Sequence, residues 1–416
     1  MRKLLEESFR AAVAAADPLE ILAPHLPQPP KGRTFVAAAG KAAASMALAV
    51  ERNYPGEVQG IAITRYGHAL PTTKIRVVEA GHPIPDEAGE AAAREILEET
   101  RDLRKDDLLL ALLSGGGSSL LSLPAADIPM ADLKAVTRDL LRSGAAIQEI
   151  NTVRKHLSAI HGGRLAAASG APVLALIISD VTGDEPTHIA SGPCAPDPTT
   201  CAEALEILEH YQVAPTAAVR KRLASGADET PKPGDAIFAK VQNKVIATAH
   251  RSLEAAADVF SKSGIRSIIL GDTITGEARE VAKVFASLVK EIRNYGSPWK
   301  PPVALVSGGE CTVTLGAEGG RGGRCAEFLL SLGIETGGVW AIAADTDGID
   351  GSEDNAGAIL APGSMGKSRD ARAFLARHDS YGFFSALGNL VVTGPTLTNV
   401  NDYRAIVVPR ASQYGS

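Results

Sequence analysis

The chain has 416 residues, of which 45% are hydrophobic and only 4% aromatic, with 41 glycines. Its 42 basic and 48 acidic side chains give a net charge of −6, which argues against a nucleic-acid binder that depends on a general basic field. The length exceeds that of one ordinary core, and the composition is typical of an α/β enzyme, so two domains are expected.

Neither a targeting segment nor a metal motif stands out. The four cysteines form no C-x-x-C pair, and the nine histidines form no H-x-x-H or H-x-x-x-H pair. Glu6 and Glu7 interrupt the segment where a signal peptide needs an apolar run, and no stretch has the apolar length that a bilayer requires. We therefore expect a cytoplasmic protein that uses neither a membrane nor nucleic acid.

Strand and helix patterns alternate in the first half of the chain. The helical patterns cover 4–16, 41–52, 86–101, 130–141 and 146–158, and the strand patterns cover 34–38, 58–63, 75–79, 107–113 and 172–179. Such alternation predicts a Rossmann-like, mainly parallel sheet that is covered by helices on both faces.

The stretch from 224 to 235 is the most linker-like part of the chain, since it is rich in Gly, Pro and charged residues. We therefore expect an N-terminal domain over 1–233 and a C-terminal α/β domain over 236–416. In the second half, strands are predicted at 245–247, 265–270, 302–306, 312–315, 338–344, 390–392 and 405–408, and helices at 252–261 and 276–295. The predicted fold class is thus two α/β domains, with the active site in the cleft between them.

Two short glycine runs each follow an apolar strand. The first reads Ser114-Gly115-Gly116-Gly117-Ser118-Ser119, and the second reads Ser307-Gly308-Gly309-Glu310. A buried strand that ends in small residues lets the backbone turn sharply and present N–H groups outward, which makes a concave site for phosphate or carboxylate oxygens. Two such sites indicate an enzyme that holds two anionic groups, although a tight packing turn also explains the first run.

Lys41 follows Gly40 at the point where the predicted strand 34–38 gives way to a helix. Ligands bind at the carboxyl ends of parallel strands, and an ammonium group beside a helix N-terminus suits a phosphoryl oxygen. A solvated lysine beside a turn is the plainer explanation.

Two aspartates also follow predicted buried strands. Asp180 ends the run Ile178-Ser179-Asp180, and Asp347 lies in Asp345-Thr346-Asp347-Gly348. Carboxylates in such places can hold Mg²⁺ or accept a hydroxyl proton, whereas an Asp- and Gly-rich turn is the structural alternative for the second.

The run Gly319-Gly320-Arg321-Gly322-Gly323-Arg324 embeds two arginines among glycines. Glycine leaves room beside a guanidinium group, whose forked donors match phosphate or carboxylate. Two histidines, His82 and His156, stand alone in the sequence, and a lone histidine is more often structural than catalytic.

Taken together, these segments resemble the glycerate 2-kinase family, whose C-terminal domain is of MOFRL type. The strings that carry the resemblance run in family order from residue 39 to residue 402. They are Ala39-Gly40-Lys41-Ala42-Ala43, Tyr66-Gly67-His68, Glu79-Ala80-Gly81-His82-Pro83, Ser114 to Ser118, Asn151-Thr152-Val153-Arg154-Lys155-His156, Ile178 to Val181, Ser191-Gly192-Pro193, Ser307 to Glu310, Gly322-Gly323-Arg324, Asp347 to Gly351, Thr393 to Thr396, and Asn399 to Asp402.

The resemblance implies ATP-dependent phosphorylation of D-glycerate to 2-phosphoglycerate with Mg²⁺, in the cleft between the domains. It also implies that Lys41 and Arg324 face the transferring phosphate. We expect Asp180 or Asp347 to orient the acceptor hydroxyl or to bind Mg²⁺. The residues expected to bind substrate or phosphate are Ser114, Gly115, Gly116, Gly117, Ser118, Ser119, His82, Arg154, Ser307, Gly308, Gly309, Glu310 and Arg321. Cys325 stands where relatives commonly carry Asn, which bears on affinity or substrate preference.

Two other functions stay open at this stage. One is an NAD(P)H-dependent hydroxypyruvate reductase, but the run that begins Gly115-x-Gly117 has Leu120 in place of the third glycine of a dinucleotide loop. The other is a non-enzymatic sensor of sugar acids or sugar phosphates. The sequence also leaves open the oligomeric state, with a homodimer among the options, and which glycine run holds the nucleotide and which the glycerate.

Overall fold

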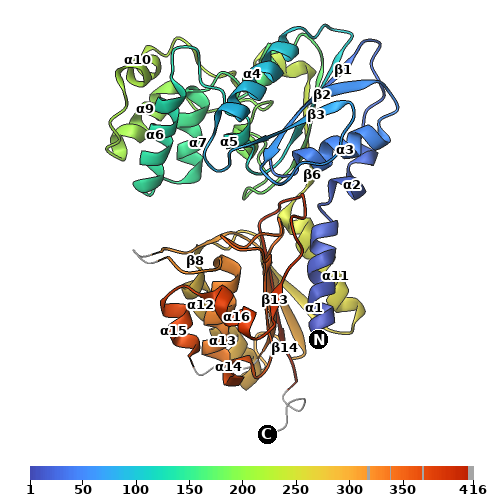
Figure 1. Cartoon of the computed structure of the whole chain (residues 1–416), viewed down its shortest axis with the longest axis vertical. Helices are drawn as coiled ribbons and strands as arrows, with labels where there is room; N and C mark the ends of the chain where they lie inside the picture. Colours follow the sequence, from blue (N-terminus) through green and yellow to red (C-terminus); the bar gives the residue numbers. More distant parts are fainter. Residues whose placement is uncertain (316–318, 338, 368–369, 411–416) are drawn as a thin grey trace. The chain divides into compact units, whose positions relative to one another are not determined.

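The computed structural model describes residues 1–315, 319–337, 339–367 and 370–410. The chain folds into two compact units, Pro18–Ile246 and the combination of Met1–Asp17 with Ala247–Ser416 (Figure 1). The expected domains were 1–233 and 236–416; in this division Met1–Asp17 group with the C-terminal half of the chain, and the first unit extends to Ile246. Each unit is an α/β unit with its own sheet, as predicted.

The first unit is built on a six-stranded sheet with the order β3-β2-β1-β4-β5-β6. Its strands are β1 (Thr34–Ala39), β2 (Val58–Arg65), β3 (Ile75–Ala80), β4 (Leu108–Leu113), β5 (Val173–Ile178) and β6 (Val241–Ala247). Strands β1 to β5 pair in parallel, and β1, β4 and β5 are buried along their whole length. The parallel sheet is confirmed, and the turns after these three neighbouring strands meet at one edge.

Some helices of the first unit cover this sheet, and others form a separate layer beside it. They are α2 (Pro18–Ile21), α3 (Ala43–Asn53), α4 (Glu87–Arg101), α5 (Gly117–Leu120), α6 (Met130–Arg142), α7 (Ile147–His156), α8 (Arg164–Ala168), α9 (Cys201–His210) and α10 (Ala217–Ser225). Helix α4 buries Ile96 and Leu97 against one face of the sheet. Helices α6, α7, α9 and α10 share a hydrophobic core of their own (Figure 1).

The second unit is built on a mixed sheet with the order β13-β12-β11-β14-β9-β7. Its strands, with a separate two-stranded pair formed by β8 and β10, are β7 (Arg266–Gly271), β8 (Gly276–Glu277), β9 (Val303–Ser307), β10 (Cys311–Thr312), β11 (Trp340–Asp345), β12 (Gly357–Leu360), β13 (Leu390–Val391) and β14 (Asp402–Val408). Only β7 and β9 pair in parallel in the six-stranded sheet, and the other pairs are antiparallel. Gly338, the first residue of the strand predicted at 338–344, lies outside the described residues.

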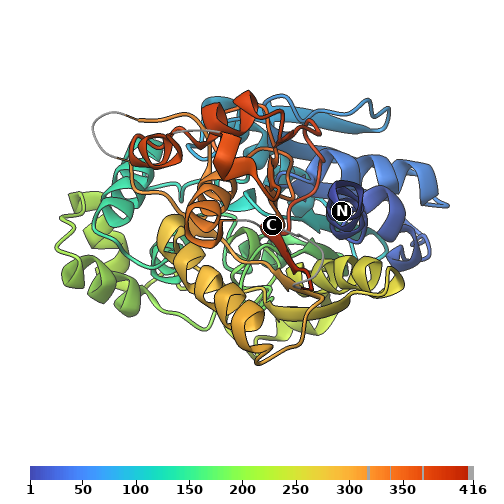
Figure 2. The same ribbon diagram turned by 90° about the horizontal axis from the view of Figure 1, so that it is seen from below.

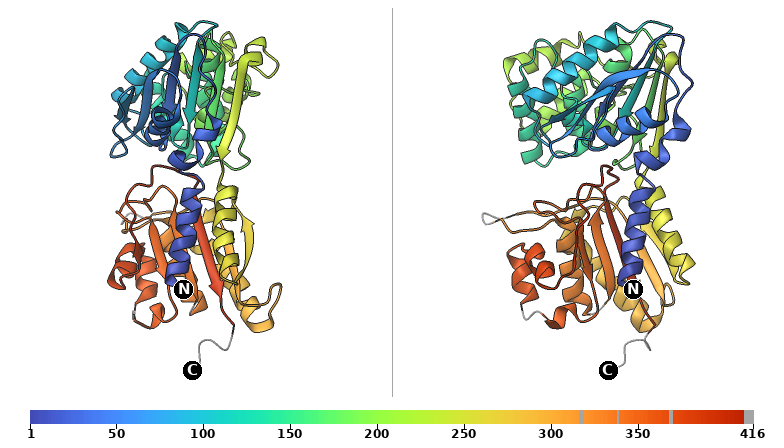
Figure 3. Two further views of the ribbon diagram at one scale, coloured as in Figure 1. Left: turned by 90° about the vertical axis from the view of Figure 1, so that its right-hand side faces the viewer. Right: turned by 45° about the vertical axis from the view of Figure 1, so that its right-hand side comes forward.

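The helices of the second unit lie on both sides of this sheet. They are α1 (Arg2–Ala14), α11 (Ala249–Lys262), α12 (Ala278–Tyr295), α13 (Arg324–Thr336), α14 (Ser364–Lys367), α15 (Ala371–Ala376) and α16 (Ser380–Ala386). Helices α12 and α13 pack against each other and contribute to one core (Figure 2). Helix α1 lies beside α11, and the two contribute to the core on the other side (Figure 3).

The amphipathic face of α1 explains why the first residues join the second unit. Leu5, Phe9 and Ala12 are buried in a cluster with residues of α11 and β14. The ring of Phe9 lies 5.9 Å from that of Tyr403, whose hydroxyl donates a hydrogen bond of 2.8 Å to Ser8. The helical pattern is local, but its partner is almost 400 residues away in the sequence.

Among the residues that the structure describes, no helix combines the length and apolar character needed to cross a bilayer.

Replacing Phe9 by Ala should destabilise the second unit by about 3 kcal/mol, because it leaves a cavity in a packed core. Both tryptophans of the chain, Trp299 and Trp340, belong to this unit, so tryptophan fluorescence during urea unfolding reports it selectively. Arg10→Ala, on the exposed face of the same helix, is the control and should change the midpoint little. An unchanged midpoint for Phe9→Ala would contradict the placement of α1.

Candidate functional site

The turn after β1 contacts the turn after β4 and is hydrogen-bonded to it. Gly40 has φ +129°, and a Cβ there would collide with Ser114. The Ser114 hydroxyl accepts a hydrogen bond from the N–H of Ala42 at 3.0 Å, and the N–H of Lys41 donates to the carbonyl of Gly115 at 2.8 Å. Glycine is therefore required at position 40, and the close approach fixes where Lys41 begins.

The first glycine run is a sharp turn into the short helix α5. Gly116 has φ +80°, and a Cβ on it would stand 2.9 Å from Nε2 of His82 and 3.4 Å from Cγ of Lys41. Lys41 and His82 thus both lie close to Gly116. Within the described part of the chain, the N–H groups of Gly115 and Gly116 have no protein acceptor. Two backbone donors beside a lysine and a histidine form a concave site that suits an anion.

Ser191 and Arg154, which the sequence analysis also named, are linked to the same turn. The hydroxyl oxygen of Ser191 lies 2.8 Å from that of Ser118 and 3.3 Å from Oδ1 of Asn151, and the same Oδ1 accepts a hydrogen bond of 3.2 Å from Arg154. Burial lowers the pKa of Arg154 to about 10, so its guanidinium group still carries a proton at neutral pH. This chain of contacts joins α5 to α7.

A cavity of about 510 Å³ opens beside this turn. Its lining combines hydroxyl groups, cations and apolar side chains: Pro83, Ile84, Pro85, Ser118, Ser119, Ser122, Leu133, Lys134, Thr137, Arg138, Leu141, Arg142 and Arg154. Asp180 is half-buried in the turn after β5, at the sheet edge that also carries Lys41 and Ser114. The first unit therefore gathers five predicted features, namely Lys41, His82, the glycine run, Arg154 and Asp180, along one edge.

The second glycine run turns just as sharply after β9. Gly309 has φ +100°, and a Cβ there would collide with the backbone of Ile274, so only glycine fits. The carbonyl of Gly308 accepts a hydrogen bond of 2.8 Å from the buried side chain of Arg404. Glu310 follows with its side chain 57% exposed.

Arg324 is held by carboxylates of this unit. Its Nη2 lies 2.7 Å from Oδ2 of Asp345 and 3.4 Å from Glu310, and its Nε lies 2.7 Å from Oδ1 of Asp402. Burial alone would lower the pKa of Arg324, but these three carboxylates outweigh it and raise the pKa. The guanidinium group is permanently charged, and its direction is fixed at two of its nitrogens.

The two arginines of the glycine-rich run have different surroundings. The side chain of Arg324 is 22% exposed, whereas that of Arg321 is 60% exposed. Arg321 pairs with Glu353 at 3.0 Å and lies over the ring of Tyr381. The structure thus does not bring Arg321 to the carboxylates that hold Arg324.

The acidic turn after β11 is almost entirely buried. The N–H of Asp347 donates to Oδ1 of Asp345 at 3.0 Å, and Oδ1 of Asp347 accepts from Ile349 at 2.9 Å. Asp350 accepts the N–H groups of Cys325 and Ala326, at 2.9 and 2.8 Å, and burial raises its pKa to about 7.

Cys325 begins the buried face of α13. Its side chain is fully buried in the core of the second unit, and burial raises the pKa of its thiol. The side chain at this position therefore packs in a core.

The sequence analysis gave no role to Asp402 or Arg404, and none to Asp345 beyond its place in the acidic run, although the structure joins the three in one ion-pair network with Arg324. Asp402 bridges the two arginines, because its Oδ2 lies 2.6 Å from Arg404 and its Oδ1 lies 2.7 Å from Arg324. The sequence did contain signals for these residues. Asp345 begins the acidic run quoted above, Asp402 ends the string from Asn399, and Arg404 is a charged residue inside an apolar strand.

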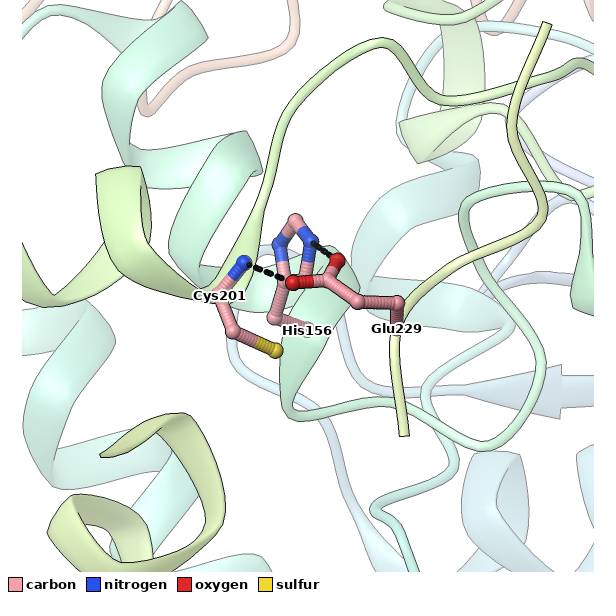
Figure 4. A group of neighbouring side chains, drawn as sticks. All are labelled: His156, Cys201 and Glu229. Carbon is pink, nitrogen blue, oxygen red and sulfur yellow. Dashed lines mark hydrogen bonds and ion pairs between the residues drawn. The ribbon is translucent and has the colours of Figure 1, made fainter. Parts of the chain in front are cut away.

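His156 belongs to a different group, with Cys201 and Glu229 (Figure 4). Their potential ligand atoms lie within 4.8 Å of one another. Glu229, however, accepts the N–H of Cys201 at 2.8 Å and pairs with Lys232 at 2.9 Å, and Nδ1 of His156 lies 2.8 Å from the carbonyl of Thr152. Burial lowers the pKa of His156 and raises that of Cys201 to about 11. These partners satisfy the group as a structural network that ties the 229–232 segment to α7 and α9.

Replacing Arg324 by Ala should destabilise the second unit by about 3 kcal/mol, because Asp345 and Asp402 are left buried with less compensating charge. The matched control is Arg321→Ala, which removes an exposed arginine from the same run and should cost less than about 1 kcal/mol. Urea unfolding followed by tryptophan fluorescence measures both. Equal effects of the two substitutions would contradict the difference in burial.

Comparisons of this chain with known proteins identify its family. The family model described as "Domain of unknown function (DUF4147)" matches residues 4–224, and the MOFRL family model matches residues 303–402. A protein of Agrobacterium vitis that carries the provisional name hydroxypyruvate reductase is 50% identical over 98% of this chain and 94% of its own length. A glycerate 2-kinase of Pyrococcus horikoshii is 42% identical over 91% of this chain and 88% of its own length.

A solved structure leads to the same family. The crystal structure of a glycerate kinase from Thermotoga maritima superposes with a TM-score of 0.87 at 36% identity, covering 98% of this chain and 99% of that one. The chain belongs to the two-domain glycerate 2-kinase family, with an N-terminal DUF4147 domain and a C-terminal MOFRL domain.

Proposed function

We propose that this protein transfers the γ-phosphoryl group of ATP to the C2 hydroxyl of D-glycerate, giving 2-phosphoglycerate and ADP. The observation that carries the proposal is the meeting of Lys41, His82 and Gly116 at the carboxyl edge of the parallel sheet, in a chain similar to glycerate 2-kinases over most of its length. An anion site of backbone N–H groups and cations is what a phosphate-handling enzyme needs at that place.

Phosphoryl transfer depends on positioning and on neutralising the phosphate oxygens, because the chemistry itself needs little covalent help. In the proposed mechanism, Lys41 and Arg324 face the transferring group. The fixed direction of Arg324 supports its part, since two carboxylates hold its nitrogens at 2.7 Å. The C2 oxygen bonds to the γ-phosphorus as the bond to ADP breaks, and a carboxylate accepts the hydroxyl proton.

Mg²⁺ is part of this proposal, and Asp180 is the better candidate to bind it. Mg²⁺ binds through one or two carboxylates, with water and substrate phosphates in its remaining positions. Asp180 is half-buried and lies at the edge that carries the proposed anion site. Asp347 is only 3% exposed and accepts an N–H from Ile349, so it is proposed as the group that orients the acceptor hydroxyl. The ion would supply positive charge to the phosphate oxygens.

A second candidate function comes from the provisional reductase name of two relatives. In a dinucleotide-binding fold the glycine run opens a long helix, whose N-terminus holds the pyrophosphate. Here α5 is four residues long, and the third glycine position is the fully buried Leu120. The run is thus built as a turn, which favours the kinase.

Purified protein with D-glycerate, ATP and Mg²⁺ should form a product that enolase consumes without added phosphoglycerate mutase. A signal that needs the mutase would keep the kinase but move the phosphate to C3. Silence in both assays, with NADH oxidation in the presence of hydroxypyruvate, would replace the kinase by the reductase. Binding of D-glycerate without any turnover would favour a sensor.

Lys41→Ala should lower kcat by about 100-fold or more, because a cation aimed at the developing phosphate charge is lost. The unfolding midpoint of the first unit should change little, since the side chain of Lys41 is not buried in a core. The matched control is Lys105→Ala, which removes an exposed lysine from the loop before β4. Near-normal turnover by Lys41→Ala would remove this lysine from the mechanism.

A further inference from the structure

We propose that the cavity beside the first glycine run binds the nucleoside triphosphate, with the base against α6 and the phosphates toward Arg154 and the glycine turn. This inference rests on the proposed kinase function and decides which glycine run holds the nucleotide. It concerns the first unit alone, because every residue that lines the cavity lies between Pro83 and Arg154.

The size of the cavity fits a nucleotide better than a small hydroxy acid. Its volume is about 510 Å³, within the usual range of sites that enclose ligands of several tens of atoms. A three-carbon acid fills only a small part of such a space. The cavity therefore needs a larger occupant.

Four cations stand around this cavity. Lys134, Arg138 and Arg142 are spaced by four residues along α6, so they share one face of the helix, and Arg154 projects from α7. Arg138 has an exposed ion pair of 3.0 Å with Asp139, which is weak in water. The positive charge that remains suits a polyphosphate.

Arg154 is the cation that most clearly needs an anionic ligand. Among the described residues it makes no ion pair, and its one hydrogen bond goes to the neutral Asn151. Its neighbour Lys155, by contrast, is paired with Asp197 at 2.7 Å in the protein interior. A partly buried guanidinium group without a carboxylate is costly unless a ligand anion completes it.

The apolar part of the lining suits a nucleobase. Ile84 and Leu141 are large hydrophobic side chains that are 69% and 58% exposed, and both line the cavity. A flat base laid against them would remove apolar surface from water.

The chain itself connects this apolar wall to the anion site. Pro83 and Ile84 directly follow His82, the residue that stands against Gly116. At the other side, Ser118 lines the cavity and belongs to the same turn as Gly116. A nucleotide with its base at Ile84 and Leu141 thus directs its phosphates toward Arg154, Ser118 and the glycine turn.

The test is a titration of the protein with Mg²⁺ and AMP-PNP, a non-hydrolysable ATP analogue, and separately with inorganic tripolyphosphate. Leu141→Asn and Arg142→Ala should each weaken AMP-PNP binding by about 10-fold. Only Arg142→Ala should weaken tripolyphosphate binding to the same extent, because Leu141 contacts the base. The KM for D-glycerate should stay within about twofold in both variants.

The control variant is Arg220→Ala, which removes one exposed positive charge from α10 of the same unit. It should leave AMP-PNP binding unchanged. Leu141 and Arg142 are both exposed at the end of α6, so neither substitution disturbs the core. Circular dichroism and urea midpoints of the variants establish this.

Two results would overturn the inference. If the variants raise the KM for D-glycerate and leave AMP-PNP binding unchanged, the cavity holds the acid; if neither quantity changes, it holds neither substrate. A different result separates the inference from the proposed function. If AMP-PNP binds with the expected variant pattern while D-glycerate is not phosphorylated, the nucleotide site stands and the acceptor substrate is wrong.

Discussion

The candidate site of the first unit depends on one close approach, between the backbone at Gly40 and Ser114. Neighbouring parallel strands β1 and β4 end at the same sheet edge, and their turns come so near that no side chain fits at position 40. Two hydrogen bonds across this contact then fix Lys41 and Gly115. The close approach thus fixes where the backbone of Lys41 begins and how the glycine turn leaves β4, which sets the backbone of the proposed anion site.

The arginines of the two units differ in whether protein carboxylates pair with them. In the second unit, Arg324 and Arg404 share the carboxylate of Asp402, Arg324 also pairs with Asp345, and these pairs are largely removed from water. Such a network is stable only when it is complete, which gives Arg324 a fixed direction. In the first unit, Arg154 makes no ion pair within the described residues. Arg324 in the second unit is thus a cation that protein carboxylates hold in a fixed direction. Arg154 in the first unit is a cation that a ligand anion can pair with.

The sequence predicted the first sheet well because its central strands are apolar along their whole length, a pattern typical of buried parallel strands. It missed β12, which has four residues and begins with glycine, and α9, although Thr200 and Glu203 form a capping box there. The helical pattern of the first residues was recognised, but its docking on the second unit was not, because local periodicity carries no information about a distant partner.

The electrostatics of the site show why composition alone misleads about ligands. A net charge of −6 disfavours a general nucleic-acid binder, yet it hides five cations near one edge of the first unit: Lys41, Lys134, Arg138, Arg142 and Arg154. The spacing of three of them along α6 is visible in the sequence, but the same spacing describes any solvated helix face. Only the packing of α6 beside Arg154 and Ser118 turns that face into one wall of a cavity. The proposed affinity for a nucleotide therefore depends on the fold, since the fold sets the distances over which these charges act together.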